Sequence, residues 1–263
     1  MNTTPALRLD DVSQQFGALK AVDQVSFSVV PGARHAVIGP NGAGKSTLFA
    51  LIAGLRRASG GRVVAFGEDV TALPEHRRVA RGVVRTFQHS ALFLTHTTRE
   101  NVLFAVQREA GVSWSMLRPL RSRYALRDRA EELLAEVHLN GREEVLAGSL
   151  SHGERRQLEV AVALACRPRL LLLDEPVAGM SAAETARFKA LIDALPKETT
   201  VMLIEHDLDL VFDLAETVTV LHLGRHLITG TPEEVRSSEQ VQSAYLGAAD
   251  TSDLFTDTTG GSQ

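Results

Sequence analysis

The sequence has a single cysteine and no long apolar run. Cys166 cannot form a disulfide within the chain, and its isolation fits a reducing compartment. The longest apolar run, around Leu170–Leu173, ends in Asp174 and Glu175, far short of the roughly 20 residues that span a bilayer. The first residues, MNTTPALRLDDV, contain no apolar signal core. We therefore expect no membrane span, and attachment to a membrane only through a partner.

A strong charge of one sign is also missing. The 263 residues carry a formal net charge of -4, which argues against a general binder of nucleic acid or of anionic membranes. The hydrophobic content of 44% and the charged content of 23% are ordinary for a globular protein. The length allows one large domain or two small ones.

The order of apolar strands and helices indicates an α/β fold. Strands are expected at Arg34–Ile38, Leu170–Leu173 and Thr200–Ile204, and a helix near Ala182–Leu195 separates the last two. A strand–helix–strand order favours a parallel sheet. From about His89 to Arg167 the strand signals fade, and helical spacing of apolar residues appears in three segments: Asn101–Glu109, Tyr124–Val137 and Gly153–Cys166. We predict an α/β core with a helical subdomain inserted in its middle, and a disordered polar tail over residues 248–263.

The stretch GPNGAGKST matches G-x-x-x-x-G-K-[ST], the phosphate-binding loop. Glycines let the main chain wrap closely around phosphate, and the following helix presents its N-terminus to the anion. Lys45 is expected to reach the β- and γ-phosphates, and Ser46 to ligate Mg²⁺. The alternative is a glycine-rich turn before a helix, but the preceding apolar strand favours the nucleotide site. Its predicted residues are Gly39, Pro40, Asn41, Gly42, Ala43, Gly44, Lys45, Ser46 and Thr47.

The stretch PRLLLLDEP, residues 168–176, is an apolar strand that ends in two carboxylates. Buried parallel strands have this composition, and ligands gather at the carboxyl ends of such strands. Asp174 is expected to hold Mg²⁺, directly or through water, and Glu175 to polarise the attacking water as a general base. The alternative is a strand end with two solvated acids.

Five motifs in order now resemble the ATP-binding subunit of ABC transporters: the phosphate loop, a glutamine after a strand (RTFQ), LSHGE, LLLLDEP and IEHD. The resemblance covers the chain from about Leu7 to Gly247. It implies an α/β P-loop NTPase core with an antiparallel β subdomain and an inserted helical subdomain. The core would comprise residues 7–88 and 168–247, and the helical subdomain about 89–167.

The stretch LSHGE is similar to the family's signature motif, usually LSGGQ. The resemblance implies that Ser151 and Gly153 contact the γ-phosphate of ATP held by another subunit. A serine at the start of a helix suits this task, because the helix N-terminus attracts anions. On its own, however, the stretch could be a simple helix cap, since Ser151 and Glu154 have the spacing of a capping box.

The resemblance gives three more residues a role. Gln88 would reach Mg²⁺ and the attacking water and would link the core to the helical subdomain. His206, in IEHD, would hydrogen-bond the γ-phosphate and help to position Glu175. Phe16 would stack on adenine. The run Ala178–Ser181 occupies the place of the D-loop, which crosses the dimer interface in this family, although it differs from the usual SALD.

The family implies partners as well as ATP and Mg²⁺. We expect transmembrane permease subunits, a second ATPase that is either the same chain or a related one, and indirectly a solute-binding protein. Nucleic acid is not expected. The location would be peripheral, on the cytoplasmic face of the inner membrane. The arginine-rich run Arg118–Arg129 is either a solvated helix face or a face near the membrane partner or anionic lipid.

Further details resemble one group of importers. The stretches RTFQHSALF, GERRQLEVA and AYLG are similar to branched-chain amino acid uptake ATPases, and LSHG and DEPVAGM also resemble their urea and amide branch. The lipopolysaccharide-export ATPase is an alternative, ranked lower because its insert is shorter. A soluble ABC ATPase of DNA repair or ribosomes is another, but no coiled-coil insertion or tandem half is visible. A non-catalytic subunit is disfavoured by Glu175 and His206.

Overall fold

The computed structural model describes residues 4–86, 92–111 and 120–246. The chain divides into two compact units, Met1–Ala72 with Met202–Gln263 and Leu73–Val201, and each is described by itself. Among the described residues, no helix combines the length and the apolar character needed to cross a bilayer. The predicted tail 248–263 lies outside the described residues.

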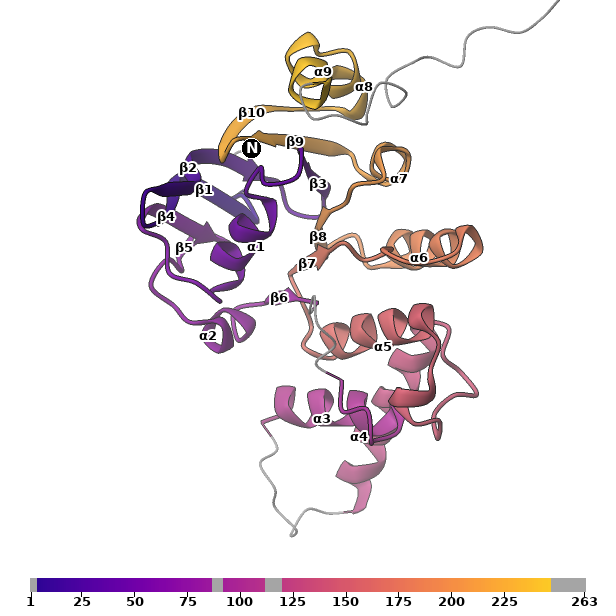
Figure 1. The fold of residues 1–263 in the computed structure, drawn as a ribbon. Coiled ribbons are helices and arrows are strands. Elements are labelled where there is room, and N and C mark those ends of the chain that lie inside the picture. Colours follow the sequence, from indigo (N-terminus) through magenta and orange to yellow (C-terminus); the bar gives the residue numbers. More distant parts are fainter. Residues whose placement is uncertain (1–3, 87–91, 112–119, 247–263) are drawn as a thin grey trace, which may run out of the picture. The chain divides into compact units, whose positions relative to one another are not determined.

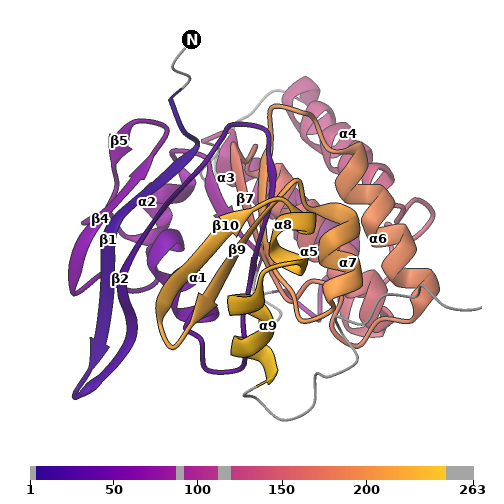
Figure 2. The same ribbon diagram turned by 90° about the horizontal axis from the view of Figure 1, so that it is seen from above.

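The first unit contains a four-stranded antiparallel sheet in the order β2-β1-β4-β5 (Figure 2). The sheet has one buried face, because apolar side chains alternate with exposed ones along β1, where Leu7, Leu9 and Val12 are buried. This sheet confirms the antiparallel β subdomain. Its strands are β1 (Leu7–Phe16), β2 (Leu19–Val29), β4 (Gly60–Ala65) and β5 (Glu68–Asp69).

A second set of strands in the first unit leads to the phosphate loop. Strand β3 (Arg34–Ile38) is buried at all five positions and pairs in parallel with β9 (Thr217–His222). Strand β9 pairs antiparallel with β10 (Arg225–Gly230), as expected for a hairpin around Gly224. The helices of this unit are α1 (Lys45–Ala53), α7 (Leu208–Leu214), α8 (Pro232–Arg236) and α9 (Glu239–Leu246).

The second unit holds a parallel strand pair and the predicted helices. Strand β6 (Val83–Arg85) pairs in parallel with β7 (Leu170–Asp174), and β7 is buried throughout. Strand β8 (Thr200–Ile204) crosses the boundary between the two units. The helices are α2 (Glu75–Val79), α3 (Thr98–Glu109), α4 (Leu120–Glu136), α5 (His152–Ala165) and α6 (Ala182–Ala194), with a 3-10 turn η1 at Ala147–Ser149.

Helices α3, α4 and α5 pack against one another (Figure 1). Their contact is apolar, with Val102 of α3, Leu133 and Leu134 of α4 and Leu158 of α5 all fully buried. The opposite face of α4 carries arginines from the predicted run, which pair with glutamates of the same helix, as Arg127 does with Glu131 at 2.9 Å. The described part of the arginine-rich run is therefore a helix face with local ion pairs.

Candidate functional site

The phosphate loop turns sharply between β3 and α1. Gly39, Gly42 and Gly44 have φ angles of +149°, +78° and +97°, a range that side-chain-bearing residues rarely adopt. Gly44 is the N-cap of α1 and, because it has no side chain, makes no side-chain hydrogen bond to the first turn of the helix. A loop of this shape ahead of a helix N-terminus suits an anion.

Two of these glycines are also required by neighbouring backbone. A Cβ at Gly39 would stand 2.1 Å from the carbonyl oxygen of Leu221 on β9. A Cβ at Gly44 would stand 2.3 Å from the carbonyl oxygen of Ala21 on β2. Gly39 and Gly44 therefore allow the backbone of β9 and β2 to approach the loop closely. The motif alone gives only the approach of a phosphate as the reason for these glycines.

Lys45 folds back over the loop. Its Nζ donates to the carbonyl oxygens of Gly39 at 2.6 Å and of Pro40 at 3.1 Å, and the residue is only 6% exposed. Carbonyls that hold the ammonium keep its charge beside the helix N-terminus, where a phosphate would sit.

Tyr245, on α9, reaches the same loop from the far end of the chain. It is buried and makes a hydrogen bond with the backbone of Gly39. Burial raises the pKa of the Tyr245 phenol, so the hydroxyl stays neutral. The stretch AYLG resembles a feature of the family, and the sequence gives no signal of this contact between Tyr245 and the phosphate loop.

Phe16 lies at the end of β1 with 41% of its surface exposed. The Arg56 guanidinium lies 5.2 Å from the ring centroid, within the range of a cation–π contact. An exposed, flat ring of this kind could stack on a nucleotide base, as expected for adenine.

Asp174 ends strand β7 and is 1% exposed. Its Oδ2 accepts a hydrogen bond from Arg85 Nη2 at 2.5 Å, while Oδ1 has no hydrogen-bond partner in the described part of the chain. A buried carboxylate oxygen that protein leaves unpartnered fits a hard cation such as Mg²⁺. Among the described residues, no group of three or more His, Cys, Asp or Glu side chains could hold a metal ion.

Glu175 follows directly and has a φ of +47°. This left-handed conformation is costly for a residue with a side chain, and such strain concentrates at functional sites. The side chain is half-buried. The strained residue comes directly after Asp174, the last residue of β7.

Ser151 is the N-cap of α5. Its hydroxyl accepts from the Glu154 N–H at 3.2 Å, and the Glu154 side chain accepts from the Ser151 N–H at 2.8 Å. The predicted capping box is confirmed. Ser151 and Gly153 also line a cavity of about 270 Å³, whose charged side chains are two arginines and two glutamates: Arg142, Arg187, Glu154 and Glu184.

The signature segment is tied to the D-loop segment. His152 Nε2 lies 2.9 Å from the Ala178 carbonyl oxygen. A Cβ at Gly153 would stand 2.4 Å from Oε1 of Glu184, whose side chain caps Ser181 at the start of α6. A side chain at position 153 would therefore have to displace the end of the Glu184 side chain.

The predicted site residues fall into two groups. The phosphate loop, Phe16 and His206 belong to the first unit, and His206 is exposed just after β8. The second unit holds Asp174, Glu175, Ser151 and Gly153. Gln88 lies outside the described residues. A role for Arg85, the partner of Asp174, was not predicted. Its position at the end of an apolar strand is a sequence signal that could have indicated a site residue.

Comparison with known proteins agrees with these motifs. A family model described as "ABC transporter" matches residues 22–178, and a model described as "Branched-chain amino acid ATP-binding cassette transporter" matches residues 229–251. The chain is similar to the high-affinity branched-chain amino acid transport ATP-binding protein BraF of Pseudomonas aeruginosa, with 39% identity over 93% of this chain and 99% of that protein. It is 33% identical to the lipopolysaccharide export system ATP-binding protein LptB of Haemophilus influenzae, over 92% of this chain and 97% of LptB.

The fold is also similar to solved structures. The ADP conformation of an ATP-binding cassette of an ABC transporter matches 93% of this chain and 100% of its own, with a TM-score of 0.81 and 30% identity.

Proposed function

Because this chain belongs to the ATP-binding proteins of ABC transporters, and among them to the branched-chain amino acid group, we propose that it powers the uptake of branched-chain amino acids. As an ABC transporter ATPase, it binds ATP and hydrolyses it to drive transport. The match at residues 229–251 favours this solute over urea, amides or lipopolysaccharide. In this proposal the ATPase domain runs over 7–247, with its core at 7–88 and 168–247 and the helical insert at about 89–167.

The phosphate loop carries the proposal. Backbone N–H groups between Asn41 and Thr47 and the Lys45 ammonium bind the phosphates, and the N-terminus of α1 adds its dipole. The oxygens of Ser46 and Asp174, with Gln88, would hold Mg²⁺, which neutralises charge on the phosphate oxygens when it is bound.

Hydrolysis needs a proton acceptor and a group that orients the γ-phosphate. Glu175, on its strained turn, takes the proton of the attacking water, and His206 donates a hydrogen bond to the γ-phosphate. The ring of Phe16 stacks on adenine.

A second ATPase completes the site. Ser151, Gly153 and the N-terminus of α5 bind the γ-phosphate of ATP on the second subunit, either another copy of this chain or a related one. The cavity beside Ser151 has two arginines in its lining, and they face two glutamates, with Arg142 paired to Glu154 at 3.0 Å. ATP then stabilises the closed pair, and hydrolysis releases it.

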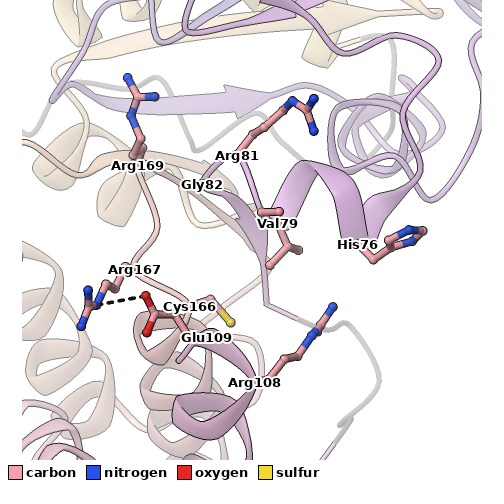
Figure 3. A pocket seen from close by; sticks show the side chains of 10 residues that line it. His76, Val79, Arg81, Gly82, Arg108, Glu109, Cys166, Arg167 and Arg169 are labelled. Atoms are coloured by element: carbon pink, nitrogen blue, oxygen red, sulfur yellow. Dashed lines mark ion pairs between the residues drawn. The ribbon is translucent and has the colours of Figure 1, made fainter. Parts of the chain in front are cut away.

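In this proposal, the transmembrane permease subunit binds at a basic pocket in the second unit (Figure 3). The pocket has a volume of about 510 Å³, and its lining carries several cationic side chains against one carboxylate, Glu109, which pairs with Arg167 at 3.4 Å. Such a pocket suits a carboxylate-bearing cytoplasmic segment of a transmembrane subunit. This contact would hold the chain at the cytoplasmic face of the membrane. The basic residues of the lining are His76, Arg81, Arg108, Arg167 and Arg169.

Substitution of the proposed general base tests the assignment of hydrolysis. Glu175→Gln removes the proton acceptor but keeps the size of the side chain, so ATP turnover should fall by about 10²- to 10⁴-fold while ATP binding remains. Glu132→Gln, on the exposed face of α4, is the matched control and should leave turnover unchanged. Unchanged hydrolysis in Glu175→Gln would show that Glu175 is not the base.

Transport by the assembled complex tests the solute. Vesicles that contain this chain, its co-purified membrane subunits and the solute-binding protein should take up labelled leucine with ATP, and should not take up labelled urea. Co-purification with ribosomes or DNA in place of membrane subunits would overturn the transport function.

A further inference from the structure

Arg85 and Asp174 form a buried ion pair at the ends of two neighbouring strands. Arg85 is the last residue of β6, and Asp174 is the last residue of β7. The two strands pair in parallel, with Arg85 opposite Leu172, and the Thr86 N–H donates to the Leu172 carbonyl at 2.9 Å. Backbone pairing therefore places the ends of the two strands side by side.

The pair is largely removed from water, because the side chains of Arg85 and Asp174 are 9% and 0% exposed. A buried carboxylate without a cation is costly, and the guanidinium offsets that cost at the observed separation of 2.5 Å. The ion pair thus holds the Asp174 side chain in place at the end of β7.

The contact is one-sided. Arg85 Nη2 reaches only Oδ2 of Asp174, and neither Oδ1 of Asp174 nor Nε of Arg85 has a hydrogen-bond partner within the described ranges. A purely structural Arg–Asp pair would normally use both carboxylate oxygens in a bidentate contact. Here the pair leaves one oxygen available in a fixed orientation.

We propose that Arg85 is a positioning residue that clamps Oδ2 of Asp174 and so presents Oδ1 to the metal ion of the nucleotide complex. This inference rests on the proposed function, in which Asp174 holds Mg²⁺. Partners that orient a metal ligand in this way typically change metal affinity by about 10- to 100-fold when they are removed.

Metal and nucleotide affinities, measured separately, test the role of Arg85. The full chain is loaded with ADP, and Mn²⁺ is titrated in by electron paramagnetic resonance, while ADP affinity is measured in EDTA. Arg85→Met should weaken Mn²⁺ binding by about 10- to 100-fold and leave ADP affinity in EDTA within twofold. Arg85→Lys, which restores the cation, should recover part of the Mn²⁺ affinity. Arg156→Met, which breaks another shielded pair with Glu159 at 2.9 Å, is the matched control and should leave Mn²⁺ binding unchanged.

The outcomes separate this inference from the function on which it rests. Asp174→Asn should also weaken Mn²⁺ binding, and if it does not, the assignment of Asp174 to the metal fails. If Asp174→Asn weakens Mn²⁺ binding and Arg85→Met does not, only the role of Arg85 fails. Equal losses of Mn²⁺ and ADP affinity in Arg85→Met would indicate general disruption and would also overturn it. Arg85→Gln provides the same comparison if Arg85→Met does not fold.

Discussion

Replacement of two glycines in the phosphate loop by alanine separates backbone strain from steric overlap. Gly42 has a φ of +78°, and among the described residues no atom beyond its neighbours lies within 4 Å of a Cβ built there. Gly39 has a φ of +149°, and its Cβ would lie 2.1 Å from the Leu221 carbonyl oxygen and 3.1 Å from Ala43 Cβ. Gly42→Ala therefore introduces strain alone, whereas Gly39→Ala introduces strain and a clash with backbone.

The magnitudes follow from these contacts. A left-handed conformation costs a non-glycine residue about 1–2 kcal/mol, which is the whole effect expected for Gly42→Ala. For Gly39→Ala, the Leu221 carbonyl is about 1 Å closer than a carbon–oxygen contact allows. Moving it disturbs the β3–β9 pairing next to Ile38 and Val220, and overpacking adds about 1–3 kcal/mol to the strain. We expect Gly39→Ala to lose about 4 kcal/mol in total.

Thermal unfolding with and without ADP measures both effects. With roughly 2–4 °C of Tm per kcal/mol, Gly42→Ala should lower Tm by about 5 °C and Gly39→Ala by about 10 °C or more. ADP should raise the Tm of the wild type, and this increase should disappear in Gly39→Ala, because the loop can no longer aim its N–H groups at phosphate. Equal Tm values for the two variants would refute the steric argument.

Three further variants test other contacts. Burial lowers the pKa of His35 from 6.5 to about 4, so the unfolded chain binds more protons between these values; the free energy of unfolding should fall by up to about 3 kcal/mol as pH drops from 6.5 to 4. Urea denaturation should show this slope in the wild type and a flatter one in His35→Gln. Tyr245→Phe loses the hydrogen bond to Gly39, so ADP affinity measured by calorimetry should weaken about two- to tenfold; an unchanged value would remove Tyr245 from the site. Ser181→Ala removes the cap of α6 and should cost about 1 kcal/mol in urea denaturation, and no loss would contradict the capping role.

Local features were predictable from the sequence. The phosphate loop, the capping box of Ser151 and Glu154, and the acidic end of the strand Leu170–Asp174 all depend on residues that are close in the chain. Their hydrogen bonds and dihedral angles are set within a few residues, so spacing and residue type are sufficient to identify them. The order of the motifs was likewise sufficient to recognise the family.

Only the tertiary structure revealed the contacts that support these features. Arg85 clamps Asp174 from 89 residues away, and the carbonyl of Leu221 forbids a side chain at Gly39. Burial lowers the pKa of His35, which packs against Phe27 and bonds Thr219. These effects depend on which strands become neighbours and on how far water is excluded. Strand neighbours and water exclusion are determined by the packing of the whole chain and not by any local pattern of residues.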